Sequence, residues 1–409
     1  MDILPVARAL LRRKFGAVLI GLQMALSVAI LANAVNVIQQ RLQHMQRPTG
    51  LQENRLLTLH NQFTGPVDDL SARIQADLAQ LRALPGVEDA AALFGMPLGG
   101  AGQAASAALD RDLKQRSTIV AEYLTSDRAM RLLGFRIIAG RPFNADEIHE
   151  LRSSADYHES VVILSQALAL RLFPKGDALG KLIYLGAPEP GRIIGIVAHA
   201  QAPWASNDEG AGFFAGVGEY SVFQPMQAVN ADLTYVVRAQ PGRLDGLAPL
   251  AERTLYAVSR ERIVSNAHTF AETRAVQYRS DHSLALILTV VCALMLAIAA
   301  LGVIALTLYW VAQRRRQIGI RRALGASWRD ILAYFHAENL LIAGSGAVIG
   351  IAGGYAANIW LAANQGITRM GVGYLCIAAA AVLVLSQLAV LWPALRAAAL
   401  SPAAAIRGQ

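Results

Sequence analysis

Four long apolar runs, separated by polar stretches, set the pattern of this chain. They span about residues 15–38, 283–312, 331–361 and 372–395. A transmembrane helix needs about 20 predominantly apolar residues, so each run is long enough to cross a bilayer. The run 283–312 holds no Asp, Glu, Lys or Arg. As a helix it measures about 45 Å against a hydrocarbon core of about 30 Å, so it must tilt or project as a stalk, and we expect it to project. The pattern predicts an α-helical membrane protein with four transmembrane helices.

The polar block 39–282 alternates helix-like and strand-like segments. The apolar run 161–164 is typical of a buried strand, and Ser165 is placed to cap a helix that follows it. Residues 68–84 and 244–258 show helical periodicity. The sequence therefore predicts a large α+β domain inserted between transmembrane helices 1 and 2.

The placement of charge decides how the composition is interpreted. The chain is 54% hydrophobic and 16% charged, with a formal net charge of +8. Residues 39–283 hold 24 Lys and Arg against 26 Asp and Glu, so the positive excess lies in short segments beside the apolar runs. The positive-inside rule then places these segments and both termini in the cytoplasm, and the large domain outside. Charge distributed in this way is a topology signal and argues against nucleic acid as a partner.

The first run has an alternative interpretation as a signal peptide, because Ala32-Asn33-Ala34 resembles a cleavage site. The run is long for a signal peptide, so we expect an uncleaved anchor. The expected order is a cytoplasmic N-terminal segment (1–14), transmembrane helix 1 (15–38), the outside domain (39–282), transmembrane helix 2 with its stalk (283–312), a cytoplasmic coupling segment (313–330), transmembrane helix 3 (331–361), a short outside loop (362–371), transmembrane helix 4 (372–395) and a cytoplasmic tail (396–409).

The segment 313–327 carries five arginines between the second and third apolar runs. Residues 313–324 predict a short helix with an apolar stripe formed by Ile320, Ala323 and Leu324. Gly325 suits the left-handed position that ends a helix, and Ser327 begins a capping box for the next one. Such a stiff, two-part element is a surface on which a motor subunit could push. The alternative is a positively charged anchor that binds anionic membrane lipids.

The third run contains two further candidate features. Gly346, Gly350 and Gly354 are spaced four residues apart and form one smooth helix face. That face serves either close packing within the chain or a dimer contact. Glu338 is an ionisable residue inside the run, which is a functional-site hypothesis by default. It lies near enough to the cytoplasmic edge for a structural role to remain open.

Enzyme chemistry is not indicated by the sequence. The nearest approach to a Walker A motif, residues 176–182, has the wrong glycine spacing and no Ser or Thr after Lys181. His149-Glu150 begins like a zinc-protease helix, but Ser153 stands where the second ligand belongs. We expect no catalytic, cofactor-binding or metal-binding residue on this chain.

The segment after the second run resembles the coupling motif of MacB/FtsX-type ABC transporter permeases. Gln317 departs from the family's usual Glu, which puts any salt bridge of that Glu in doubt. The matching positions are Arg315, Arg316, Ile318, Gly319, Ile320, Arg321, Arg322, Ala323, Leu324, Gly325, Ala326 and Ser327. Glu338 also matches a Glu common in the family's third helix. The polar block resembles the MacB-like periplasmic core domain through short strings at 84–87, 140–143, 161–165, 179–181, 194–197 and 235–238, and the tail 400–407 resembles the family's ending.

This resemblance implies a bacterial inner-membrane permease whose large domain is periplasmic. It implies a dimer with an identical or similar second permease, and a cytoplasmic ABC ATPase on another polypeptide that holds the ATP and Mg. Export would use ATP-driven movement transmitted to the outside domain, with a periplasmic adaptor and an outer-membrane channel as further partners. The residues that would contact the ATPase are Arg314, Arg315, Arg316, Gln317, Ile318, Gly319, Ile320, Arg321, Arg322, Ala323, Leu324, Gly325, Ala326 and Ser327.

Two other functions remain open at this stage. An FtsX-like protein that does not transport would regulate a periplasmic partner such as a cell-wall hydrolase. A membrane-anchored sensor or scaffold would need no motor. The size of the outside block favours export, and the sequence does not identify the substrate.

Overall fold

The computed structural model describes residues 14–65, 67–153, 157, 160–186, 189–205, 217–365 and 370–398. The chain divides into two compact units. The helical unit contains the described residues up to 45 and from 281 onward, and the α+β unit contains those between 46 and 280. Residues 1–13 of the expected cytoplasmic N-terminal segment and the family-like tail 400–407 lie outside the described residues.

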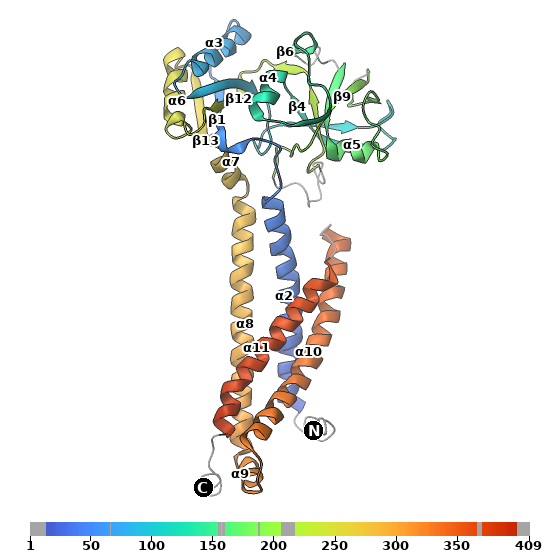
Figure 1. The fold of residues 1–409 in the computed structure, drawn as a ribbon, viewed down its shortest axis with the longest axis vertical. Helices are drawn as coiled ribbons and strands as arrows, with labels where there is room; N and C mark the ends of the chain where they lie inside the picture. The colour runs from blue at the N-terminus through green and yellow to red at the C-terminus, as the bar shows by residue number, and fades with distance from the viewer. Residues whose placement is uncertain are drawn as a thin grey trace. The chain divides into compact units, whose positions relative to one another are not determined.

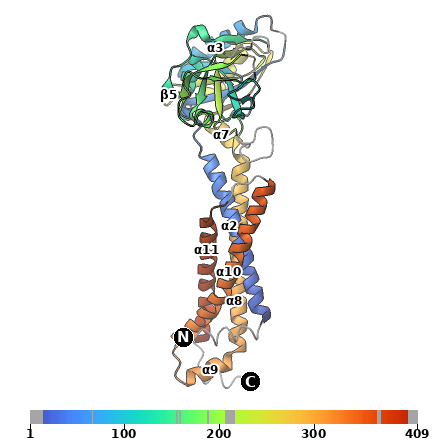
Figure 2. The ribbon, with the colours of Figure 1, turned by 90° about the vertical axis from the view of Figure 1, so that its right-hand side faces the viewer.

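Four helices of the helical unit are long and apolar enough to cross a membrane, which confirms that prediction. α10 packs along both α2 and α11, and these three helices lie side by side (Figures 1 and 2). The core between the helices is built from small and aliphatic residues, including Met24, Val28, Ala343 and Val382. The bounds of the four helices are α2 (Lys14–Met45), α8 (Arg279–Gln313), α10 (Trp328–Gln365) and α11 (Val372–Ala398).

A four-stranded antiparallel sheet forms one part of the α+β unit, in the order β13-β1-β12-β2. Leu57, Leu59 and Tyr235 are buried with residues of two helices, α3 (Leu70–Arg82) and α6 (Leu247–Val258). The alternation along β1 sends Leu57 and Leu59 to this face and Thr58 and His60 to the other. The strands are β1 (Leu56–Phe63), β2 (Val87–Leu93), β12 (Asp232–Ala239) and β13 (Arg262–Thr269).

A mixed seven-stranded sheet forms the other part, in the order β3-β4-β10-β7-β9-β5, with β8 paired to β9. The pairs β4–β10 and β7–β9 are parallel. Its strands are β3 (Gln103–Ala107), β4 (Thr118–Leu124), β5 (Ile137–Gly140), β7 (Val161–Ser165), β8 (Leu182–Ile183), β9 (Gly191–Val197) and β10 (Ser221–Gln224). The smaller elements of the unit are β6 (His149–Leu151) paired with β11 (Met226–Ala228), the 3-10 turns η1 (Glu53–Arg55) and η2 (Ala145–Glu147), and the helices α4 (Asp127–Leu133), α5 (Gln166–Leu172) and α7 (Phe270–Gln277).

The predicted elements of this unit are confirmed with shifted ends. The run 161–164 lies in β7, and the Ser165 hydroxyl accepts a hydrogen bond from the Leu168 amide at 3.3 Å, as the cap of α5. The helix expected from residue 244 begins at Leu247, because Gly246 has a left-handed backbone with φ of 76°. A residue in that conformation cannot belong to the helix it precedes.

A buried ion pair joins the edge strand β13 to helix α3. Arg262 donates to both carboxylate oxygens of Asp77, at 2.8 and 3.0 Å, and neither side chain is exposed. The Tyr235 hydroxyl also donates to Asp77, at 2.9 Å. A charge in an apolar core is tolerated only when it is paired in this way, so these residues fix how α3 lies on the sheet.

Candidate coupling site

The segment between α8 and α10 folds as the sequence predicts, into a short helix, a glycine stop and a capped helix. Helix α9 (Arg315–Ala323) follows α8 after one residue. Gly325 has φ of 98°, and the Ala326 amide donates back to the Arg321 carbonyl at 3.0 Å, which closes the helix end. Ser327 and Asp330 then cap each other's backbone amides at the start of α10, at 2.9 and 3.3 Å.

An ion pair clamps the end of α8 to α10. The Arg314 guanidinium donates to both carboxylate oxygens of Glu338, at 2.7 and 3.0 Å. The two side chains are only 12% and 2% exposed. A bidentate arginine–carboxylate pair fixes orientation as well as distance. The ionisable residue that the sequence singled out is therefore the anchor point for the first basic residue of the coupling segment.

Tyr334 is the second contact between these helices. Its hydroxyl accepts a hydrogen bond from Arg314 at 3.2 Å, and its ring lies 5.7 Å from the Arg314 guanidinium and 5.2 Å from that of Arg321. Below it, Ile318 of α9 is buried in the core that also holds Ile331 and Phe335 of α10. These residues line a small cavity of about 40 Å³ at the junction. Helix α9 is thus held to α10 by packing on one side and by arginine–aromatic contacts on the other.

The apolar stripe predicted on α9 is exposed among the residues that the structure describes. Ile320 is 46% exposed and Leu324 is 83% exposed, and Trp328 at the start of α10 is 49% exposed. Exposed apolar side chains on a helix, beside basic residues, are typical of a face that docks into a groove of a partner. The packing face is instead formed by Ile318 and the buried Gly319.

The fourteen expected contact residues fall into two groups in the structure. Arg314, Ile318 and Gly319 face inward, Ala326 is half-buried, and the side chain of Arg322 lies outside the described residues. The exposed members are Arg315, Arg316, Gln317, Ile320, Arg321, Ala323, Leu324, Gly325 and Ser327. These nine exposed residues lie on α9 and directly after it, and we call them the docking face.

The glycine face of α10 packs against α2 of the same chain. A Cβ atom at Gly346 would lie 2.4 Å from the Gly21 carbonyl oxygen, and one at Gly350 would lie 2.5 Å from that of Ala25. At Gly354 it would lie 3.1 Å from the Cα of Ala29. Of the two alternatives left open by the sequence, close packing within the chain is the one that this structure contains.

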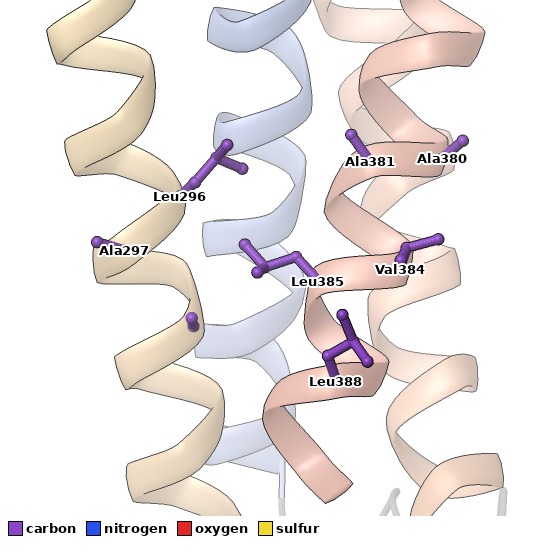
Figure 3. Close-up of a pocket in the computed structure, with 8 residues that line it drawn as sticks. Leu296, Ala297, Ala380, Ala381, Val384, Leu385 and Leu388 are labelled. Atoms are coloured by element: carbon purple, nitrogen blue, oxygen red, sulfur yellow. The ribbon is translucent and has the colours of Figure 1, made fainter.

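An apolar groove between α8 and α11 is a feature that sequence patterns do not reveal. It has a volume of about 520 Å³ and is lined by alanine, leucine and valine side chains alone. Figure 3 shows Leu296 of α8 and Leu385 of α11 pointing toward one another across it. No side chain that lines it can donate or accept a hydrogen bond, so the groove offers no reactive chemistry.

Comparison with known proteins gives the class and the family. The family model "MacB-like periplasmic core domain" matches residues 17–248, and "FtsX-like permease C-terminal" matches residues 289–402. Together with the four apolar helices, these matches define an ABC transporter permease. The chain belongs to the MacB/FtsX-type permeases, with a MacB-like periplasmic core domain and an FtsX-like C-terminal region.

Relatives of this chain are named as export proteins. It is 27% identical to "Macrolide export ATP-binding/permease protein MacB" of Chromobacterium violaceum over 55% of this chain and 33% of the relative. It is 26% identical to the protein of that name in Pasteurella multocida, over 68% of this chain and 39% of the relative. The chain thus spans about a third of the length of the curated relatives that it matches.

Two solved structures are also similar to part of the chain. The extracellular domain of the noncanonic ABC-type transporter YknZ from Gram-positive bacteria is 15% identical, with a TM-score of 0.33, and covers 51% of this chain and 100% of its own. The periplasmic region of MacB from Actinobacillus actinomycetemcomitans is 13% identical, with a TM-score of 0.33, and covers 56% of this chain and 97% of its own.

The contacts that hold the segment 314–327 in place were not apparent from the sequence. Neither Tyr334 nor the pairing of Arg314 with Glu338 was predicted. A signal was present, because Arg314 and Glu338 lie at similar distances from Gly325 on either side, and a helical hairpin at that glycine brings such positions together.

Proposed function

We propose that this chain is the membrane subunit that transmits ATP-driven movement from a cytoplasmic ATPase to the periplasmic α+β unit, to drive export or extraction of a substrate. The observation that carries the proposal is the docking face. It combines exposed aliphatic residues with basic ones on a short helix that the rest of the chain holds rigidly. An anchor for lipid headgroups needs the arginines alone, whereas Ile320 and Leu324 suit a protein groove.

Force applied to α9 would be passed on to two membrane helices. The Arg314–Glu338 pair and the Tyr334 contacts join the end of α8 to α10, so movement of one helix would be passed to the other. The glycine face in turn packs α10 against α2 along about two turns. This arrangement supports transmission of movement by helices and requires no solute channel through the helical unit.

The partners and the orientation follow from the same proposal. Both termini and α9 lie in the cytoplasm of a bacterial inner membrane, and the α+β unit lies in the periplasm. In this proposal a P-loop ATPase on another polypeptide binds ATP and Mg²⁺. A second permease, identical or similar, completes the membrane part. A periplasmic adaptor and an outer-membrane channel would serve export across the outer membrane.

Affinity purification from the native membrane in mild detergent, followed by mass spectrometry, tests the proposal. We expect an ATPase with a P-loop in stoichiometric amount, and its loss when Ile320→Glu and Leu324→Glu are combined. These side chains are exposed, so the double variant should remain folded. Leu250→Glu, at an exposed leucine of α6 in the α+β unit, is the matched control and should keep the ATPase. Absence of an ATPase from the wild-type sample, or its retention by the double variant, would contradict the proposal.

A further inference from the structure

The α+β unit is joined to the membrane helices by two chain segments, and these segments are bound to each other. One follows α2 and contains Arg47, Thr49 and Glu53, and the other is α7, which precedes α8. Arg274 of α7 donates to Glu53 Oε1 at 2.7 Å and to the Arg47 carbonyl at 2.8 Å. Thr49 Oγ1 donates to the same Glu53 oxygen at 2.5 Å.

Both segments also bind Gln201, a residue of the loop after β9. The Gln201 amide nitrogen Nε2 donates to the Tyr278 hydroxyl at 2.6 Å, and its backbone amide donates to the Thr49 carbonyl at 3.2 Å. Gln201 and Tyr278 are both buried. Tyr278 ends α7, and the next residue, Arg279, begins α8. We call Arg47, Thr49, Glu53, Gln201, Arg274 and Tyr278 the connector network.

The connector network touches both sheets of the α+β unit. On one side, the Tyr123 hydroxyl of β4 donates to the Gln201 carbonyl, and the Ser221 hydroxyl of β10 donates to the Ala200 carbonyl at 2.8 Å. These contacts fix the Gln201 loop to the seven-stranded sheet. On the other side, Thr273 of α7 lies 3.2 Å from Thr58 of β1, oxygen to oxygen. α7 therefore lies on the four-stranded sheet, as its place beside β1 and β13 in Figure 1 shows.

We propose that Gln201 and Tyr278 are positioning residues that carry movement of α8 into the seven-stranded sheet, while α7 carries it into the four-stranded sheet. The inference rests on the proposed function and names the contact within the α+β unit through which that function operates. Without the Gln201–Tyr278 hydrogen bond, the segment leading to α8 would remain fixed to the four-stranded sheet through Thr273. Its direct side-chain link to the Gln201 loop of the seven-stranded sheet would be lost, and only the longer route through Arg274, Glu53 and the Thr49 carbonyl would remain.

The chemistry of Gln201 supports a positioning role over a stabilising one. Its Oε1 atom is buried and has no hydrogen-bond partner among the described residues. A buried acceptor left unpaired opposes folding, whereas replacing both members of a polar pair by apolar groups of similar shape is nearly neutral. The double variant Gln201→Leu/Tyr278→Phe should therefore stay folded, with an unchanged thermal midpoint, and lose only the link.

Hydrogen–deuterium exchange of the permease–ATPase complex in nanodiscs tests the inference, with nucleotide-free samples compared against ATP plus vanadate. In the wild type we expect nucleotide-dependent changes in 262–277, at the four-stranded sheet, and in 161–172 and 189–205, at the seven-stranded sheet. In the double variant the change in 262–277 should persist and the changes in the other two peptides should be clearly reduced. Tyr256→Phe is the matched control, because it also removes one tyrosine hydroxyl, which accepts a hydrogen bond from the Val264 amide at 3.1 Å outside the connector network.

The outcomes separate the inference from the function on which it rests. If the wild type shows no nucleotide-dependent change in residues 46–280, the proposed function is contradicted and the inference is overturned with it. If the wild type shows the changes and the double variant keeps all of them, the inference alone is overturned. Selective reduction at the seven-stranded sheet, with Tyr256→Phe behaving as wild type, supports it.

Discussion

Arg314 and Glu338 are joined by two hydrogen bonds, at 2.7 and 3.0 Å, across the junction where α8 ends and α10 has made about three turns. The pair lies where the coupling segment meets the apolar part of the helical unit. Because both side chains are largely buried, each charge depends on the other for its partner. This ion pair joins α8 to α10, so we expect the two helices to move together.

Removing one member of this pair should cost stability and coupling together. Glu338→Gln leaves the Arg314 charge without its counterion, a loss of about 3 kcal/mol at the lower end of the range for broken buried pairs. We expect a lower thermal midpoint in detergent and a reduced ATPase rate in the complex. The exchanged variant Arg314→Glu/Glu338→Arg should recover part of both. Equal thermal midpoints for wild type and Glu338→Gln would show that the Arg314–Glu338 pair does not stabilise the contact between α8 and α10.

Gly325 should not accept a β-branched residue. Its φ of 98° lies in the left-handed region, where an L-residue costs about 1–2 kcal/mol. A Cβ atom there would meet nothing within 4 Å, so the effect comes from the backbone and not from a clash. We expect Gly325→Val to shift α9 and to uncouple ATP hydrolysis from movement of the α+β unit. Gly325→Asn should be milder, because Asn tolerates the left-handed region. Unchanged coupling in Gly325→Val would show that the glycine stop is not needed.

Gly350 and Gly353 of α10 should respond in opposite directions to replacement by alanine, because only Gly350 is in close contact with α2. Gly350→Ala places a Cβ atom 2.5 Å from the Ala25 carbonyl oxygen, which forces α2 and α10 apart and should lower the thermal midpoint. Gly353 has nothing within 4 Å on its side. There, Gly353→Ala should stabilise the helix by up to about 1 kcal/mol. If Gly350→Ala changed only the oligomeric state and left the thermal midpoint intact, the face would be a dimer contact.

Glu122 gives the α+β unit a distinct pH dependence. Burial raises the pKa of this carboxyl, and the hydrogen bond from Tyr157 opposes the rise. An acid whose folded pKa lies above its unfolded pKa destabilises the fold once it ionises, so this group's contribution worsens as pH rises through the shifted pKa. Glu122→Gln should therefore raise the thermal midpoint at pH 7. The gain should vanish below about pH 4, where the unfolded carboxyl is also protonated. An equal difference at both pH values would contradict this explanation.

Local patterns predicted most of the helical unit. The four apolar runs predicted the four long helices. Gly325 predicted the end of α9, and Ser327 predicted the cap at the start of α10. These features depend on neighbours within a few residues. The direction of the stripe on α9 did not follow from periodicity, because Ile318 and Ile320 are both apolar and only the packing of Ile331 and Phe335 decides which one is buried.

Contacts between residues far apart in the chain could not be predicted from the sequence. Gln201 and Tyr278 are 77 positions apart and belong to a loop and a helix end, where neither residue stands out by type or spacing. Asp77 and Arg262 are 185 positions apart, and in the sequence they look like two ordinary surface charges. Their pairing depends on the fold, which places β13 beside α3 and α6. Polar residues buried by tertiary contacts carry no local signature, and this is why the connector network became visible only in the structure.

The most direct test of the central claim is site-specific photo-crosslinking at the docking face. A benzoylphenylalanine in place of Leu324, which is 83% exposed, would be irradiated in native membranes, with the same group in place of Leu250 as the control. We expect a covalent product between position 324 and a P-loop ATPase, and none at position 250. Products with lipid alone at position 324 would contradict it, and the arginines of α9 would then be membrane anchors.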